Sequence, residues 1–375
     1  MAPTHRPTST ESTLLSVRLK AQIARTGPIS VEHFMDVCMA DATAGYYPSK
    51  QPIGAGGDFI TAPEVSQVFG ELLGLWAYAV WQSMGSPERV VLAELGPGRG
   101  TLMADALRGL RRLPGFLESA TVALVETSRP LRRAQEEALS DSGAEISWHA
   151  RIEDLPPGPA IVLANEFIDA LPIRQLVWRN GQWRERCVRI GADGGFAFCD
   201  GPPLAVESLR RNAELQQLPD GSILEIRPAA NAVIAALAAR AEDAPLAALL
   251  IDYGHEATAC GDTLQAVSRH EFADPLEAPG NVDLTAHVDF GALKDAAEAN
   301  GLLAYGPKTQ GALLLELGLE ARLERLCANA SEDEREALVS GTRRLVDPAS
   351  MGVIFKALAL TSRDLAPPPA FGDST

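Results

Sequence analysis

The sequence predicts an α/β fold with a mostly parallel β-sheet, and three observations support this prediction. Short apolar runs of strand length alternate with stretches of helical periodicity along most of the chain. Several runs are apolar at nearly every position, as in parallel strands that are buried on both faces. One run ends in a glycine-rich turn, a frequent place for ligands at the carboxyl edge of such sheets. We therefore expect parallel strands joined by right-handed helical crossovers.

The expected sheet domain begins near residue 90. Apolar runs with the length of buried strands occupy residues 90–95, 121–126, 146–149, 160–164 and 246–251. Between and after these runs lie stretches with the apolar spacing of helices, at residues 101–112, 129–140, 231–242, 290–300 and 313–345. Two further strands, near residues 302–305 and at 352–358, complete the expected sheet.

The segment before the sheet domain, residues 13–87, is expected to be helical. Residues 1–12 are rich in Pro, Ser and Thr, and we expect them to form a disordered tail. The stretches with helical spacing are residues 14–25, 31–39 and 63–84. A glycine-rich loop at 54–64 is interpreted either as a flexible connector or as a mobile lid that approaches a ligand.

Residues 176–222 interrupt the alternation of strands and helices. Two β-type runs flank Asn180-Gly181, a dipeptide typical of hairpin turns, and a further run covers 196–199. We therefore expect an antiparallel β-hairpin insertion outside the parallel sheet. The remaining domain boundaries are 88–175 and 223–361 for the sheet domain and 362–375 for a C-terminal tail.

Composition excludes several classes of function. The formal net charge of −16 argues against nucleic-acid binding, which needs clustered Lys and Arg, but it can attract a cationic substrate. No apolar run has membrane-spanning length, so we expect no membrane insertion. The five cysteines are scattered without a Cys-x-x-Cys pair, which favours reduced thiols over a metal site. A cytoplasmic location follows, with an organellar presequence as the alternative.

The glycine-rich turn spans residues 94–100, with the sequence Glu-Leu-Gly-Pro-Gly-Arg-Gly. Its alternating glycines permit a sharp turn and leave room for a ligand against the main chain. A dinucleotide fingerprint needs Gly-x-Gly-x-x-Gly, but Thr101 occupies the sixth position. The pattern instead resembles the S-adenosylmethionine loop of class I methyltransferases. An ordinary connecting loop is the alternative for this motif taken alone.

A second strand supports the same cofactor, because it ends in an acid, Glu126. A carboxylate at this position can accept hydrogen bonds from both ribose hydroxyls of an adenosine. The alternative is a solvated acid at a strand end. The residues expected to contact S-adenosylmethionine are Glu94, Gly96, Pro97, Gly98, Gly100, Glu126 and Asn165.

Polar residues also follow the strands at 160–164 and 246–251. Asn165 and Glu166 come directly after an apolar run, where polar groups are costly to bury without partners. They are interpreted either as caps of a following helix or as parts of a substrate clamp. Asp252 and His255 follow the other strand, and the carboxyl ends of parallel strands meet at one edge.

Ordered sequence blocks from about residue 30 to 360 resemble one family. The blocks are Gly-Tyr-Tyr at 45–47, Gly-Asp-Phe-Ile-Thr-Ala-Pro-Glu at 57–64, Phe-Gly-Glu-Leu-Leu-Gly at 69–74, Glu-Leu-Gly-Pro-Gly-Arg-Gly-Thr-Leu at 94–102, Asn-Glu-Phe-Ile-Asp-Ala-Leu-Pro at 165–172, Asp-Tyr-Gly-His at 252–255, Asn-Val-Asp-Leu-Thr-Ala-His-Val-Asp-Phe at 281–290, Thr-Gln-Gly at 309–311 and Met-Gly-Val-Ile-Phe-Lys at 351–356. Together they resemble the MidA-like methyltransferases, which include a mitochondrial complex I assembly factor that dimethylates an arginine. The expected insertion matches no block and is a candidate determinant of partner specificity.

The resemblance implies a class I, Rossmann-like methyltransferase fold and an enzyme that transfers methyl groups from S-adenosylmethionine to a protein arginine. It further implies a respiratory complex I (NADH:quinone oxidoreductase) subunit as the substrate, a role in assembly, and the mitochondrial matrix as the alternative location. A homodimer is a further expectation. The rival functions are a non-catalytic assembly factor with the same fold and a nicotinamide-dependent oxidoreductase.

An arginine acceptor gives the acids a physical role, because a guanidinium binds carboxylates through a planar fork. We expect Glu166 to hold it, together with Asp169 or Asp252. His255 is the expected acceptor of the proton lost on methylation. The residues expected to act in catalysis are thus Glu166, Asp169, Asp252 and His255.

Overall fold

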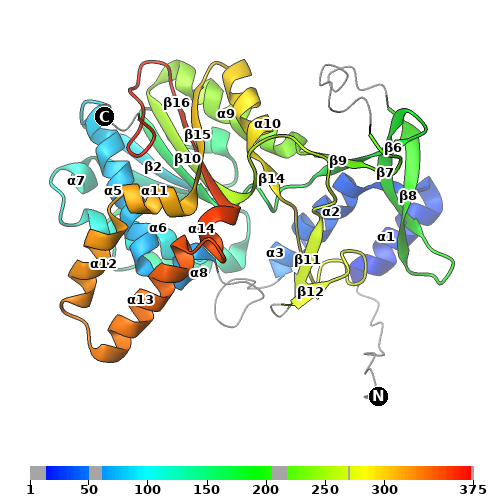
Figure 1. The fold of residues 1–375 in the computed structure, drawn as a ribbon, viewed down its shortest axis with the longest axis horizontal. Coiled ribbons are helices and arrows are strands. Elements are labelled where there is room, and N and C mark those ends of the chain that lie inside the picture. The colour runs from blue at the N-terminus through cyan, green and yellow to red at the C-terminus, as the bar shows by residue number, and fades with distance from the viewer. Residues whose placement is uncertain (1–13, 50–60, 205–217, 269–270, 373–375) are drawn as a thin grey trace.

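The computed structural model describes residues 14–49, 61–204, 218–268 and 271–372. Its central sheet has the strand order β15-β16-β10-β5-β2-β3-β4, with β14 paired to β10 (Figure 1). The strands are β2 (Val90–Leu95), β3 (Ala120–Val125), β4 (Glu145–His149), β5 (Ala160–Asn165), β10 (Leu246–His255), β14 (Val288–Asp289), β15 (Leu303–Thr309) and β16 (Phe355–Thr361). Only β16 runs antiparallel to its two neighbours, so the expected mostly parallel sheet is confirmed.

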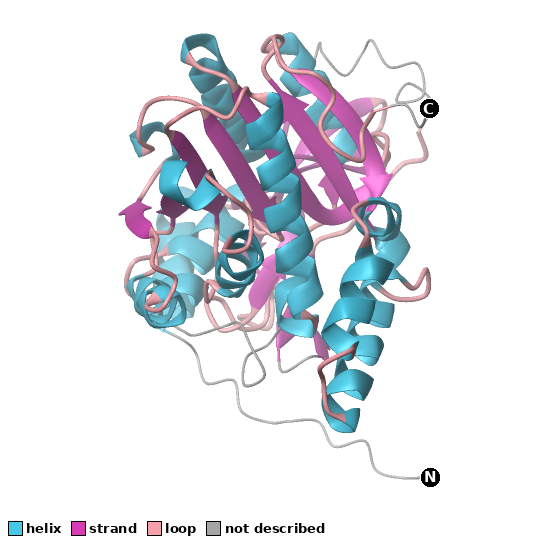
Figure 2. Ribbon diagram, turned by 90° about the vertical axis from the view of Figure 1, so that its left-hand side faces the viewer, coloured by secondary structure: helices cyan, strands magenta, loops and turns pink. Residues whose placement is uncertain are grey.

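Helices cover both faces of the central sheet (Figure 2). One face packs against α5 (Gln67–Ser83), α6 (Thr101–Leu110), α7 (Phe116–Ser119), α8 (Arg129–Leu139), α11 (Gln310–Glu316), α12 (Leu319–Cys327), α13 (Glu332–Val346) and α14 (Met351–Ile354). The other face packs against α9 (Pro228–Asp243) and α10 (Phe290–Ala299). Burial on both faces explains why β2 and β5 are apolar without alternation.

A second, antiparallel sheet lies outside the central one (Figure 1), and it also contains strands from outside the expected insertion at 176–222, namely β1 and β9. Its strands are β1 (Ile29–Ser30), β6 (Arg174–Arg179), β7 (Gln182–Ile190), β8 (Phe196–Pro203) and β9 (Ile223–Ile226). The turn between β6 and β7 is Asn180-Gly181, and both residues have positive φ angles, of 50° and 79°. These are the signs required by a type I′ turn. The Asn-Gly hairpin is therefore confirmed.

The N-terminal helices pack on this second sheet. α1 (Leu14–Thr26) and α2 (Val31–Ala40) share a core with β7 and with a small sheet made of β11 (Gln265–Ser268), β12 (Glu271–Ala273) and β13 (Asp283–Thr285). The short α3 (Tyr46–Ser49) follows. No helix among the described residues is both long and apolar enough to span a membrane.

Several element boundaries differ from expectation. The helix predicted at 63–84 is two helices, α4 (Ala62–Val65) and α5, because Ser66 is extended, with φ −159°, and caps α5 with its side chain. β10 continues to His255 rather than ending at Ile251. The last strand begins only at Phe355, after the short α14. The expected tail at 1–12 and most of the glycine-rich loop at 54–64, interpreted as either a connector or a lid, lie outside the described residues.

The point where strand order reverses lies between β2 and β5. β2 pairs with β3 on one side and with β5 on the other, all in parallel. The connections that leave these strands run to opposite sides, which opens a crevice at their carboxyl ends. The loops after β2 and β5 therefore form the candidate site.

Candidate functional site

The loop after β2, residues 96–100 and here called the glycine loop, requires glycine for two reasons. Gly96 and Gly98 have positive φ angles of 62° and 53°, which side chains disfavour. A Cβ atom on Gly96 would also lie 2.7 Å from Cδ2 of Phe167. Gly96, Pro97 and Gly98 line the candidate site, whereas Gly100 forms the N-cap of α6.

The larger of two cavities beside the glycine loop has a volume of about 360 Å³. Gly96 and Gly98 line it on one side, and Glu126, Thr127 and Ala150 line it at the ends of β3 and β4. Glu126 is held in place because its Oε1 accepts a hydrogen bond from the backbone N–H of Ser128 at 2.7 Å. Burial raises the pKa of Glu126, and that hydrogen bond partly opposes the rise.

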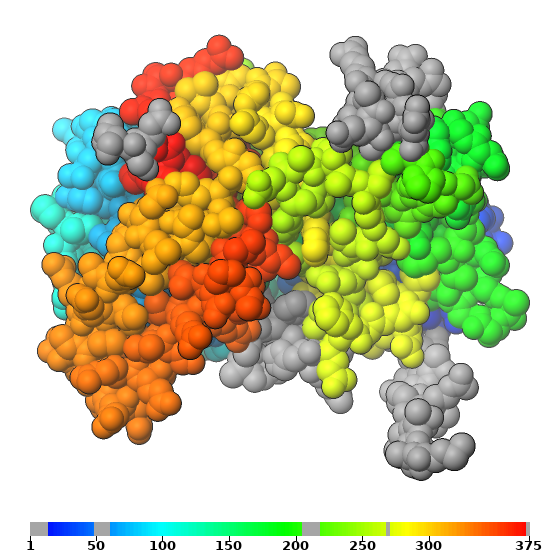
Figure 3. Space-filling view, viewed as in Figure 1, coloured from blue at the N-terminus to red at the C-terminus, as the bar shows by residue number. Residues whose placement is uncertain are grey.

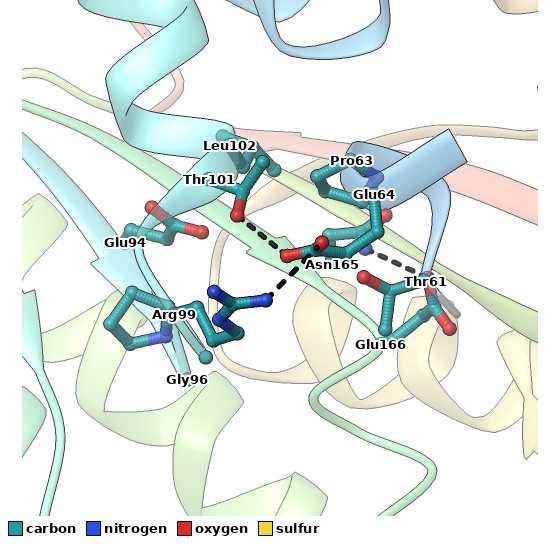
Figure 4. Close-up of a pocket in the computed structure, with 12 residues that line it drawn as sticks. Thr61, Pro63, Glu64, Glu94, Gly96, Arg99, Thr101, Leu102, Asn165 and Glu166 are labelled. Carbon is teal, nitrogen blue, oxygen red and sulfur yellow. Dashed lines mark hydrogen bonds and ion pairs between the residues drawn. The ribbon is translucent and has the colours of Figure 1, made fainter. Parts of the chain in front are cut away.

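The smaller cavity, about 40 Å³, lies on the other side of the glycine loop and contains buried acceptor atoms (Figure 4). Glu94 is 3% exposed, and its Oε2 has no hydrogen-bond donor among the described residues. Burial raises the pKa of Glu94 to about 8. Oδ1 of Asn165 is likewise without a donor there, while its Nδ2 donates to Oε1 of Glu166 at 3.1 Å. Such atoms fit a ligand that brings hydrogen-bond donors.

Glu166 lies where the two cavities meet. It lines both, as do Gly96 and Gly98. Its φ angle is 49°, and its Oε1 accepts a hydrogen bond from the backbone N–H of Ala62, at the start of α4. Burial raises the pKa of Glu166 to about 7. The expectation that Glu166 caps a following helix is wrong, because residues 166–172, here called the Glu166 loop, contain none.

Asp252 lies beneath the Glu166 loop and Asp169 is a residue of that loop, but neither lies in the cavities. Oδ2 of Asp252 accepts hydrogen bonds from the backbone N–H groups of Ile168 and Asp169, at 2.9 and 3.1 Å. Oδ1 accepts one from the backbone N–H of Tyr253 at 2.9 Å. Neither acid lines the two cavities. Both acids therefore lie close enough to interact electrostatically with Glu166, but the structure does not place them in the cavities that Glu166 lines.

Arg227, which was not predicted from the sequence, also holds the Glu166 loop. Its buried guanidinium donates to the carbonyl oxygens of Leu171 at 3.1 Å and Asp169 at 3.2 Å. It also donates to the carbonyl oxygens of Ala286 and His287, at 2.9 and 3.4 Å. No local motif marks this arginine, because its partners are main-chain atoms from two distant segments.

His255 belongs to another cavity. That cavity has a volume of about 170 Å³, and His255 lines it together with His287 and Asp289. Nε2 of His255 lies 3.8 Å from Oδ2 of Asp289. The structure therefore does not bring His255 together with Glu166, and the expected proton transfer to His255 has no geometric support.

Two further residues of the small cavity were missed (Figure 4). Glu64 of α4 accepts a hydrogen bond from Oγ1 of Thr101 at 2.6 Å, and its Oε2 lies 3.8 Å from Nη1 of Arg99. Arg99 lines the same cavity and is half exposed. Both residues lie within blocks that carry the family resemblance, which was the available signal.

Comparisons with known proteins agree with this geometry. A family model described as an S-adenosyl-L-methionine-dependent methyltransferase matches residues 72–308. The chain is 38% identical to the mitochondrial protein arginine methyltransferase NDUFAF7 homolog of Drosophila melanogaster, over 92% of this chain and 84% of that protein. It is 34% identical to the mitochondrial protein arginine methyltransferase NDUFAF7 of Homo sapiens, over 95% and 85% respectively.

A solved structure has the same fold. It is a crystal structure from Burkholderia thailandensis with bound S-adenosyl-homocysteine, with a TM-score of 0.84 and 29% identity. The alignment covers 100% of this chain and 98% of that one. The class I fold is thus confirmed, and the nicotinamide-dependent alternative is wrong.

The site fits S-adenosylmethionine, which combines a cationic ammonium group with an adenosine. The small cavity offers oxygens of Glu94 and Asn165 that have no donor within the described part of the chain, and the large cavity offers the oriented carboxylate of Glu126. The chain belongs to the family of S-adenosyl-L-methionine-dependent methyltransferases, and S-adenosylmethionine is its cofactor.

Proposed function

We propose that this enzyme methylates an arginine side chain of a respiratory complex I subunit and thereby supports assembly of that complex. The observation that carries the proposal is the position of Glu166, a buried carboxyl group where the two cofactor cavities meet. The relatives named protein arginine methyltransferases support the choice of acceptor. We infer the bacterial cytoplasm as the location, with the mitochondrial matrix as the alternative that the relatives' names favour.

The two cavities suit the two halves of the cofactor. Glu126 is placed to accept hydrogen bonds from the ribose hydroxyls in the larger cavity. Glu94 and Asn165 offer acceptors for the ammonium group in the smaller cavity, where Arg99 offers a cation for the carboxylate. The linking sulfonium then belongs near the junction, beside Gly96 and Glu166.

Glu166 is the residue that we assign to the acceptor arginine. A guanidinium stays protonated in proteins and pairs with carboxylates. When bound, the cofactor supplies an electrophilic methyl group on its sulfonium. The N–CH₃ bond forms as the S–CH₃ bond breaks, and the nitrogen loses one proton. The Glu166 carboxylate holds the guanidinium and is also a proton acceptor within reach of the same nitrogen.

Positioning is the main contribution of these residues. Alignment of two reacting groups can contribute roughly 7–11 kcal/mol to catalysis. Glu166 is suited to this task because Ala62 and Asn165 fix its Oε1, so that the side chain has little freedom.

The proposal is tested with complex I purified from cells that lack this protein. We expect labelled methyl groups from S-adenosylmethionine to enter one arginine, which peptide mapping identifies. Glu166→Gln keeps the size of the side chain but removes the carboxylate, so transfer should fall at least tenfold with donor affinity nearly unchanged. Glu153→Gln, at an exposed acid paired with Arg151, is the matched control.

Two outcomes contradict the proposal in different ways. Donor binding without methyl incorporation by the wild-type protein would favour the non-catalytic assembly factor. Normal incorporation by Glu166→Gln would leave arginine methylation intact but remove Glu166 from the acceptor site.

A further inference from the structure

A groove of about 460 Å³ lies outside the two cofactor cavities, between the start of α5 and the helix pair α12–α13. Its floor is partly apolar, with Val65, Leu326 and Leu338 among the lining residues. The orange helices α12 and α13 form a lower corner of the molecule beside it (Figures 1 and 3). Of the described residues that line this groove, only Glu64 also lines one of the two cofactor cavities.

α13 packs closely against α4 beside the groove. Gly341 approaches so closely that a Cβ atom there would lie 2.5 Å from the carbonyl oxygen of Val65. Toward its N-terminus, α13 presents Glu334, Ala337 and Leu338 to the groove. These positions are three and four residues apart and so share one face of the helix.

Glu64 connects the groove with the acceptor site. It lines the groove and also the small cavity that contains Glu94 and Glu166. Glu166, the residue assigned to the acceptor arginine, lines that small cavity as well. A chain segment in the groove can therefore direct one side chain past Glu64 toward Glu166.

The charge of the groove selects a cationic occupant. Its charged lining residues among the described part of the chain are Glu64 and Glu334, and both are acidic. The whole chain carries a formal net charge of −16, which adds to the attraction of basic segments. A second copy of this acidic chain is a poor electrostatic match for the same surface.

We propose that the groove binds the chain segment that flanks the acceptor arginine, as an extended peptide with basic or small polar residues. The inference rests on the proposed arginine methylation and adds the surface that selects the protein acceptor. The Glu166 loop then holds the acceptor arginine, while the groove between α5 and α13 binds the residues that flank this arginine in the substrate.

The test places charge in the groove without touching the cofactor site. Ala337→Arg adds a cation to the groove, and Ser340→Arg adds the same side chain at an exposed position of α13 outside the groove lining. With complex I from cells that lack the protein, Ala337→Arg should raise KM at least tenfold, with kcat at saturation and donor affinity unchanged. Ala337→Glu should lower KM, and Ser340→Arg should behave like the wild type.

A short acceptor separates docking from chemistry. Transfer to the blocked tripeptide Gly-Arg-Gly, which cannot span the groove, should be equal for the wild type and Ala337→Arg. An unchanged KM for complex I in Ala337→Arg overturns the docking proposal. A change of molecular mass in light scattering with unchanged KM assigns the groove to a second copy instead. Absence of transfer by the wild type to complex I overturns the proposed function, and the docking proposal falls with it.

Discussion

The glycine loop and the Glu166 loop line the same cavities, but they are held by different kinds of interaction. The glycine loop owes most of its shape to its own residues, since Gly96 and Gly98 adopt positive φ angles that few other residues tolerate. It also takes a distant side-chain donor, Nε2 of Gln135, which donates to the carbonyl oxygen of Gly98 at 2.7 Å. The Glu166 loop owes its shape to distant partners, because Asp252 accepts its N–H groups and Arg227 donates to its carbonyl groups. The cofactor side is therefore encoded locally, and the acceptor side depends on tertiary contacts.

The largest expected effect comes from Gly98→Val, a substitution within the glycine loop. Gly98 lines both cavities, so a branched side chain there occupies space that the cofactor needs. We expect donor affinity to fall more than a hundredfold, measured by calorimetry. Strain at the positive φ angle should also lower stability, by about 1–3 kcal/mol.

Gly143→Val is the matched control for that strain. Gly143 has a φ angle of 73°, and a Cβ atom there would meet nothing within 4 Å. The control should lose similar stability and keep full donor binding. Equal donor affinity in both variants would mean that the cofactor does not approach Gly98.

An intermediate effect is expected from Arg227→Lys, which removes hydrogen bonds that hold the Glu166 loop. Lysine keeps the charge but cannot reach four carbonyl groups from two segments, so the Glu166 loop should loosen. Arg240→Lys is the control, because Arg240 also donates to main-chain carbonyls, of Leu155 and Gly158, away from the cavities. Each variant should lose about 1–3 kcal/mol of stability, because carbonyl groups lose their donors.

Only Arg227→Lys should impair methyl transfer, by about tenfold in kcat/KM for the protein acceptor. The comparison rests on two partly buried arginines, each of which donates hydrogen bonds to main-chain carbonyl groups, in different parts of the molecule. If both variants lose stability and both retain transfer, Arg227 is structural only, and the Glu166 loop is positioned without it.

The contrast between the loops also explains what could be predicted from the sequence. Apolar runs at 90–95 and 160–164 predicted β2 and β5 nearly to the residue, because strands buried on both faces leave a strong pattern. The Asn180-Gly181 turn was also predicted from local sequence, because this dipeptide favours the positive φ angles of a hairpin turn. The placement of Glu94, Gly98 and Glu126 around one crevice followed from sheet topology.

Other features of the site could not be predicted from local sequence patterns. Glu64 reaches the small cavity only because α4 packs across the glycine loop, and the break at Ser66 that frees α4 from α5 has no strong sequence signal. Asp252 and His255 are three residues apart, yet one lies beneath the Glu166 loop and the other lines a separate cavity. Sheet topology brings strand ends to one edge, but it does not determine where each side chain points.

The smallest expected effect is a change in how stability depends on pH, and it concerns Glu94. Burial raises the pKa of Glu94 in the folded protein to about 8, well above its ordinary value of 4.5. The folded state thus binds this proton more tightly than the unfolded state. The resulting stabilisation is fully present below about pH 4.5 and is lost as the pH rises toward 8. Glu94→Gln cannot ionise, so its melting temperature should fall less than that of the wild type between pH 5 and 8.

Cofactor binding should remove much of that difference. An ammonium group beside Glu94 favours the ionised carboxylate and so lowers its pKa toward the ordinary range. We therefore expect the wild type and Glu94→Gln to differ in pH dependence without ligand and to converge with saturating S-adenosyl-homocysteine, measured by calorimetric melting. Glu153→Gln, at an exposed acid, should follow the wild type throughout. A difference that persists with the ligand bound would mean that Glu94 does not face the ammonium group, and the small cavity would then belong to the acceptor alone.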